Sequence, residues 1–157
     1  MVPKLHRARR ADRQRGTALV EFAVILPLLA LVAFGTVDLG RAYMTVNQVK
    51  NAAREGAAYA QTHPARLAGT GCTTPDSAQW YARNEAGSAG SAFVVEVSTP
   101  AGTFASSDSG CAPFSAAATS GQNVTVTVSK PFTVLTPLVR SVTGNPTIRS
   151  SVTVRVQ

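Results

Sequence analysis

The sequence is poor in the side chains that enzymes use at their active sites. Its 157 residues include only two His, two Cys and eight acidic residues. The two histidines, His6 and His63, lie far apart in the chain, which argues against a metal site. The sequence has no recognisable Ser, His and Asp set, and no glycine-rich phosphate loop precedes a helix. We therefore expect a protein that is not an enzyme and that binds no metal or cofactor.

Charge is absent from one long stretch. No charged residue occurs between Phe22 and Val37, and apolar runs of about 18 or more residues are long enough to cross a ~30 Å hydrocarbon core. We therefore expect a transmembrane helix over residues 17–38. Glu21 lies inside the start of this run, where an unpaired charge is costly. Either Glu21 has a partner, or it reaches the lipid headgroups and needs none.

The net charge of +7 is concentrated at the N-terminus. Residues 1–16 contain six Lys or Arg against one Asp, a net charge of +5, and show no apolar periodicity. A basic segment beside an apolar run stays in the cytoplasm, so the chain is predicted to cross the membrane once with its C-terminal part outside. A basic tail is also typical of nucleic-acid binding. Because no DNA-binding pattern follows it, we expect no nucleic-acid partner.

The residues around Gly16 form a more specific pattern. The basic segment ends there, Glu21 is the fifth residue after it, and the aromatic Phe22 comes next. This pattern resembles the class III prepilin signal, in which a membrane peptidase cuts after Gly. The stretches G-T-A-L-V-E-F-A-V-I-L-P-L-L at 16–29, F-G-T-V-D-L-G-R at 34–41 and N-A-A-R-E-G-A-A-Y-A at 51–60 resemble the TadE family. Members of that family are minor pilin-like proteins of the Tad (Flp) pilus assembly system.

The resemblance implies a leader, residues 1–16, that a prepilin peptidase removes between Gly16 and Thr17. The new amine at Thr17 would be positively charged near neutral pH. In type IV pilins, which this pattern resembles, the Glu at this position pairs with the N-terminal amine of a neighbouring subunit. Two buried opposite charges offset each other's desolvation. Glu21 and Phe22 are therefore expected to act in assembly and recognition. The implied partners are the peptidase, other pilin-like subunits of the Tad system, the inner-membrane assembly platform and the lipid bilayer.

Several alternatives stay open at this stage. The leader could be a disordered cytoplasmic tail that is retained, or the whole N-terminus could be a conventional secretory signal peptide cut after the apolar run. Without polymerisation, the protein would be a static single-pass envelope protein whose outer domain binds a partner. If the protein is a pilin-like subunit, it lies in the bacterial inner membrane or is incorporated in a surface pilus. A third class is an enzyme or transport component with a site in residues 99–120.

The helical pattern continues beyond the apolar run. Apolar side chains recur at spacings of three and four, which predicts an amphipathic extension over residues 39–62 and one long helix over 18–61. These positions are Leu39, Ala42, Tyr43, Val46, Val49, Ala53, Ala57 and Ala60. Pro27 is expected to kink the helix, and Asp38 is expected to pair with Arg41 across one turn. The helix should end at His63-Pro64, because the residue before Pro is disfavoured in a helix.

Residues 63–157 predict a small extracytoplasmic head of the α+β class. Alternating apolar and polar residues predict strands at 92–98, 122–129 and 147–156. An antiparallel sheet of three or more strands, with one apolar face on the long helix, gives a type IV pilin-like fold.

The connections of the head are less regular. Thr74 and Pro75 open a predicted short helix that ends near Ala86, with Trp80 and Tyr81 packed on the long helix rather than forming a binding platform. Residues 99–120 are rich in Gly, Ser, Ala and Pro and predict a long surface loop. Residues 131–143 predict a short amphipathic helix or an irregular apolar turn.

The two cysteines, Cys72 and Cys111, both fall in the predicted outer head. An even number of cysteines outside the cytoplasm favours a disulfide, and two free thiols are the alternative. Closing a loop of roughly 40 residues would stabilise the head by about 3–4 kcal/mol.

Overall fold

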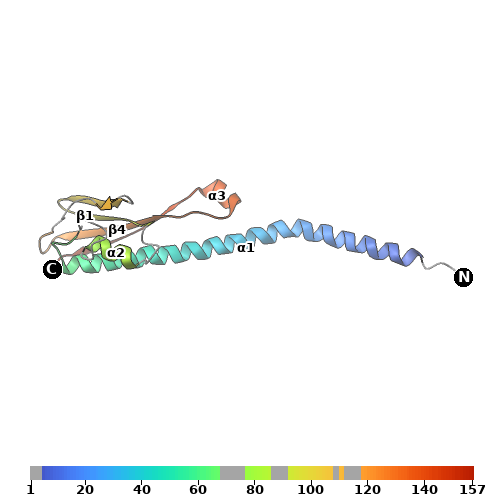
Figure 1. Ribbon diagram of the computed structural model, residues 1–157, viewed down its shortest axis with the longest axis horizontal. Coiled ribbons are helices and arrows are strands. Elements are labelled where there is room, and N and C mark those ends of the chain that lie inside the picture. Colours follow the sequence, from blue (N-terminus) through green and yellow to red (C-terminus); the bar gives the residue numbers. More distant parts are fainter. Residues whose placement is uncertain (1–4, 68–76, 86–91, 108–109, 112–117) are drawn as a thin grey trace.

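The computed structural model describes residues 5–67, 77–85, 92–107, 110–111 and 118–157, with only the backbone of 5–15, 105–107 and 110–111. Figure 1 shows one long helix with a small head packed along its C-terminal half. The N-terminal end of this helix lies far from the head. The predicted α+β architecture is confirmed.

The long helix α1 runs from Leu5 to Thr62 without a break. Its C-terminal end lies one residue from the predicted one, and His63 N donates to Tyr59 O at 3.0 Å as the last turn closes. The helix begins earlier than the predicted range of 18–61, because the backbone is already helical at Leu5, within the predicted leader. Residues 5–15 contain no Gly or Pro and several Arg and Ala, which favour a helix. Pro27 lies inside α1 and does not end it.

The head is built on a five-stranded antiparallel sheet with the strand order β3-β2-β1-β4-β5. The three predicted strands are present as β1, β4 and β5, and β4 lies between the other two. The strands are β1 Val94–Thr99, β2 Gly102–Ser107, β3 Gly110–Cys111, β4 Asn123–Pro131 and β5 Thr147–Arg155.

The prediction of one long loop over 99–120 was wrong. β2 turns back on β1 through a tight turn in which Thr99 pairs with Gly102. The Thr99 hydroxyl accepts from the Ala101 backbone N–H at 3.2 Å and donates to the Gly102 carbonyl at 3.3 Å. Gly102 has a φ of 152°, which favours glycine. The sequence G-T-F-A-S-S has little apolar alternation, so pairing with β1 rather than local pattern forms this strand.

The apolar face of the sheet packs on α1. Val124, Val126 and Val128 of β4 are fully buried, as their alternation predicted. The opposite face carries polar pairs, such as the Thr125 and Thr153 hydroxyls at 2.8 Å. The rest of the core is made mostly of small side chains, with Phe93 and Leu67 as its largest members: Val49, Ala52, Ala53, Ala57, Ala60, Leu67, Ala78, Ala82, Phe93, Val95, Val97, Ala118 and Val156. Small residues on α1 allow this close approach.

The short helix α2, Ala78–Glu85, packs against α1. The Tyr81 ring stacks on Tyr59 of α1 with centroids 4.2 Å apart, and Trp80 meets Tyr81 edge-on at 5.0 Å. The predicted packing of Tyr81 on the long helix is confirmed. The predicted cap, Thr74 with Pro75, lies outside the described residues.

Between β4 and β5 the chain leaves the sheet and forms a projection, residues 132–146, which we call the arm. It contains the third helix, α3, Pro137–Thr143. Of the two alternatives predicted for residues 131–143, a short helix or an irregular apolar turn, the structure has a helix over Pro137–Thr143. In Figure 1 the arm forms the end of the head that points toward the N-terminal half of α1.

Candidate functional site

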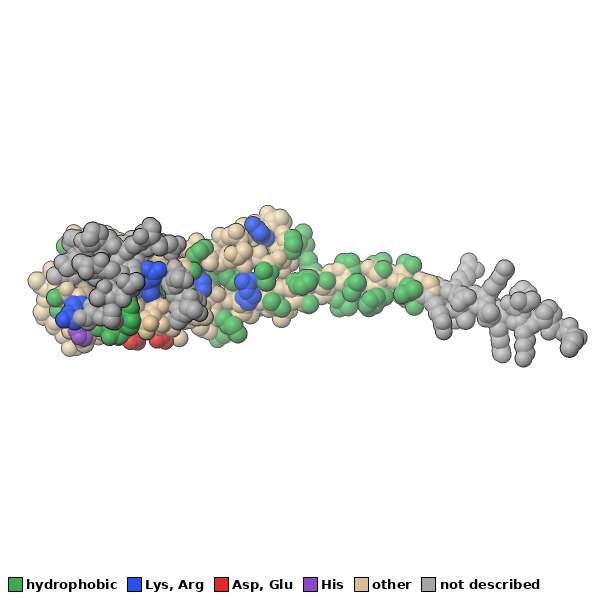
Figure 2. All heavy atoms as spheres, in the orientation of Figure 1, with side chains coloured by type: hydrophobic (Ala, Val, Ile, Leu, Met, Phe, Trp, Pro, Cys, Tyr) green, Lys and Arg blue, Asp and Glu red, His purple; other side chains and the backbone are tan. Residues whose placement is uncertain are grey.

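The N-terminal half of α1 is uncovered in the described structure. We call residues 16–37 the stem. Its best 18-residue window has a mean hydropathy of 2.4 and no buried residue, so by length and composition the helix could cross a membrane. Figure 2 shows hydrophobic side chains all along this bare part. The exposed large side chains are Leu19, Val20, Phe22, Val24, Ile25, Leu26, Leu28, Leu29, Leu31, Val32, Phe34 and Val37.

The predicted cleavage and assembly residues all lie on the stem. Gly16, Thr17, Glu21 and Phe22 are exposed on a continuous helix, away from the head. A Cβ added at Gly16 would meet no atom within 4 Å, so the fold itself does not require glycine there. A requirement for glycine at this position would therefore come from another molecule.

The stem ends where the head is attached, at Asp38. This side chain is only 10% exposed, and its carboxylate accepts three hydrogen bonds from the arm. The donors are the Leu135 backbone N–H at 3.0 Å, the Thr136 backbone N–H at 2.8 Å and the Thr136 hydroxyl at 2.7 Å. A carboxylate that accepts several short bonds is a strong anchor. Asp38 therefore ties the arm to the first turn after the stem.

Arg41 adds a second, weaker link. Its guanidinium lies 3.4 Å from the Asp38 carboxylate and donates to the Thr133 carbonyl at 3.3 Å. It also lies over the Phe132 ring, 5.5 Å from its centroid. The predicted pairing of Asp38 with Arg41 is confirmed. The larger role of Asp38, as acceptor for the arm, was missed because its partners are 97 and 98 residues away.

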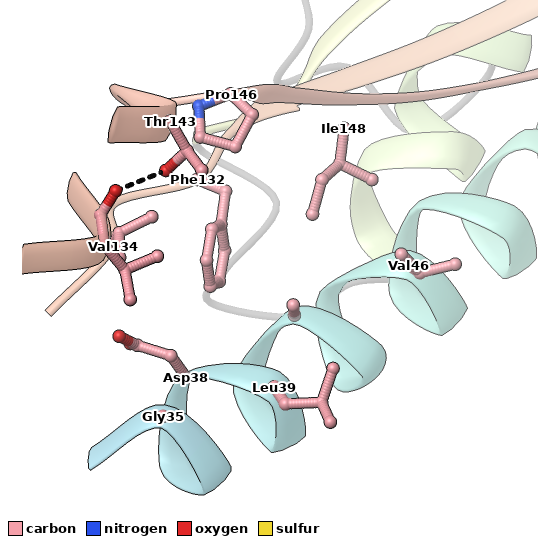
Figure 3. Close-up of a pocket in the computed structure, with 11 residues that line it drawn as sticks. Gly35, Asp38, Leu39, Val46, Phe132, Val134, Thr143, Pro146 and Ile148 are labelled. Carbon is pink, nitrogen blue, oxygen red and sulfur yellow. Dashed lines mark hydrogen bonds between the residues drawn. The ribbon is translucent and has the colours of Figure 1, made fainter. Parts of the chain in front are cut away.

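The arm, α1 and the start of β5 line an open apolar recess of about 430 Å³ (Figure 3). Phe132 and Val134 of the arm point toward α1 across this space, and Ile148 of β5 lies farther along it. The helix side of the recess is made by Gly35, Asp38, Leu39, Ala42 and Val46.

Two positions of the predicted amphipathic stripe differ from expectation. Leu39 is 72% exposed and Tyr43 is 68% exposed, so they do not contribute to the core. The core face of α1 is fully formed only from Val49 onward. Leu39 and Tyr43 instead extend the exposed apolar surface of the stem by more than a turn.

The predicted disulfide is not tested by the structure. Cys111 is in β3, but Cys72 lies outside the described residues, so the pairing stays a prediction. Among the residues with described positions, no group of three His, Cys, Asp or Glu side chains could hold a metal ion.

Comparison with known proteins supports the resemblance. The family model described as TadE-like protein matches residues 16–58, which begin at the predicted cleavage site and end near the last turn of α1. No match is found among curated proteins or among solved structures. The matched segment contains Glu21, Asp38 and Gly56, and so covers the stem, the anchor of the arm and most of the face that carries the head. Residues 16–58 of this chain are therefore TadE-like, as its sequence predicted.

Proposed function

We propose that this protein is a pilin-like subunit that inserts in the bacterial inner membrane and takes part in the assembly of a Tad-type pilus. Its leader would be removed between Gly16 and Thr17. The observation that carries the proposal is the TadE-like segment, which starts at Gly16 and coincides with a bare apolar stem. The family suggests association with a Tad pilus, and the stem is what a subunit of this kind would place in a bilayer or among neighbouring helices.

The two halves of α1 differ in what covers them, and this difference supports the proposal. The head packs on the C-terminal half of the helix, whereas the stem has exposed Leu, Val, Ile and Phe side chains on all sides. Removing apolar surface from water lowers the free energy by about 25 cal/mol per Å². An exposed apolar surface that runs along the whole stem marks a contact with lipid or protein. The same stem therefore suits both a lipid environment and a bundle of like helices, which assembly from a membrane requires.

Cleavage would give Glu21 its partner. Hydrolysis of the peptide bond after Gly16 leaves a carboxylate on the leader and an amine on Thr17. Thr17 and Glu21 are four residues apart, a rise of about 6 Å along the helix. A neighbouring stem shifted by about one turn would bring its amine to the Glu21 carboxylate. A buried pair of this kind fixes the axial register between helices, because either charge alone would be strongly unfavourable.

The test is Glu21→Ala in cells that contain the cognate peptidase and the other Tad components. We expect pilus assembly, measured from sheared filaments, to be lost while removal of the leader continues. Glu55→Ala is the matched control, since Glu55 is an exposed acid on the same helix beside the head, and it should assemble normally. Normal assembly by Glu21→Ala would contradict the proposal and favour a static membrane-anchored envelope protein.

A further inference from the structure

We propose that the tip of the arm, formed by Leu135, Leu138, Val139 and Val142, is a second membrane contact, which lies in the outer surface of the same bilayer that the stem spans. This inference rests on the proposed membrane insertion of α1. It adds a lipid-binding surface to the head, which would then be held against the membrane at two places.

The position of the tip along α1 is fixed by hydrogen bonds. Residues 17–37 span about 31 Å as a helix, close to the ~30 Å thickness of a hydrocarbon core. Asp38 is the first charged residue after this span, and it accepts the backbone N–H of Leu135 at 3.0 Å. Leu135 therefore lies at the level where the helix leaves the hydrocarbon. Figure 1 shows α3 at this end of the head, at the tip of the arm.

The tip has the composition of a lipid contact. Leu135 is 57% exposed, Leu138 is 62% exposed and Val142 is 84% exposed, and α3 has no buried residue. Large apolar side chains elsewhere in the described part of the head are mostly buried in its core. The tip therefore exposes apolar area that the head itself does not cover, and an interfacial helix buries such a face at the boundary of headgroups and acyl chains.

Charge favours lipid over a second copy of the chain. Arg140 is the sole charged residue of the arm, residues 132–146, and there is no acid in this segment. An arginine within an apolar surface suits the phosphates of anionic headgroups, which it binds through several donors. On α1, the exposed Leu39 and Tyr43 extend the apolar surface of the stem past Asp38. Tyrosine is enriched where a protein crosses the membrane–water interface.

The experiment uses tryptophan as a depth reporter in the full-length chain. Trp80 is the sole Trp of the sequence, so Trp80→Phe gives a silent background. In this background, Val142→Trp reports on the tip and Leu138→Trp is a second reporter there. Phe34→Trp reports on the stem, and Asn123→Trp is the control at the exposed end of β4 away from the arm. Each variant is reconstituted into vesicles of phosphatidylethanolamine and phosphatidylglycerol, with and without brominated acyl chains.

We expect the two tip reporters to show blue-shifted emission and to lose fluorescence with brominated lipid, as Phe34→Trp does, while Asn123→Trp does neither. If Phe34→Trp is quenched and both tip reporters are not, the second membrane contact is wrong and insertion of the stem stands. If Phe34→Trp is not quenched either, membrane insertion is also wrong. A blue shift without quenching that grows with the protein-to-lipid ratio would show that a second copy covers the tip, which overturns the lipid assignment.

Discussion

Gly56 lies where α1 packs closely against α2 and β4. A Cβ built there would lie 2.9 Å from Ala82 Cβ, 3.0 Å from the Ala78 carbonyl oxygen and 3.2 Å from Val126 Cγ1. These atoms belong to α2 and β4. None of them is the end of a long flexible side chain, so the backbone of α2 would have to move. We therefore predict that Gly56→Ala pushes α2 and the sheet away from α1.

The expected magnitude follows from two opposing effects. Inserting a methyl group into a packed core costs about 1–3 kcal/mol of folding free energy. Replacing Gly by Ala inside a helix stabilises it by about 0.5–1 kcal/mol. For Gly56→Ala the difference of the two ranges is a net loss of up to about 2.5 kcal/mol, with about 1 kcal/mol as the difference of their midpoints. Gly40→Ala is the matched control on the same helix, because a Cβ there meets nothing within 4 Å, and it should be stabilising by about 0.5–1 kcal/mol.

The assay is urea unfolding of the full-length protein in detergent, followed by the fluorescence of Trp80. This residue is on α2 and contacts Tyr81, which stacks on α1, so its emission reports on the docking of α2. The two glycine variants should shift the unfolding midpoint in opposite directions. The reasoning would be refuted if Gly56→Ala were as stable as the unmodified protein, or more stable.

Three further predictions test other parts of the structure. Asp38→Ala should speed hydrogen exchange at the Thr136 amide, which loses its acceptor, without changing exchange in β4; unchanged protection at Thr136 would contradict the anchor. Val126→Ala should lower the free energy of unfolding by about 2 kcal/mol through lost burial and a cavity, whereas the exposed Val142→Ala should change it by less than about 0.5 kcal/mol; similar losses would contradict the assigned core. Cys72→Ser should free one thiol for maleimide labelling without reductant and lower stability by about 3 kcal/mol; a labelled thiol already present in the unmodified chain would show that no disulfide forms.

The features that the sequence predicted well are encoded by neighbours in the chain. The alternation of Val124, Val126 and Val128 gives β4 its buried face, and the spacing of small apolar residues gives α1 its packing surface. The Asp38 and Arg41 pair is one helical turn apart. Each of these patterns repeats over a few residues, so the local period is sufficient to predict the element.

The features that were missed depend on contacts between distant segments. β2 has a sequence typical of a loop and forms because β1 offers it an edge to pair with. The anchor at Asp38 needs the Thr136 hydroxyl and two backbone N–H groups from another element, and no spacing rule predicts their meeting. Leu39 and Tyr43 fit the apolar period of α1 but stay exposed, because the arm meets α1 at Asp38 and Arg41 and leaves them uncovered.

The central claim is that this chain is processed as a prepilin before its stem joins other subunits. The most direct measurement is the intact mass of the protein isolated from cells that express the cognate peptidase. We predict that the mature chain begins at Thr17, and that Gly16→Leu, at a position where an added Cβ meets nothing within 4 Å, keeps its full length. An unmodified chain that still begins at Met1 in the presence of active peptidase would contradict the account.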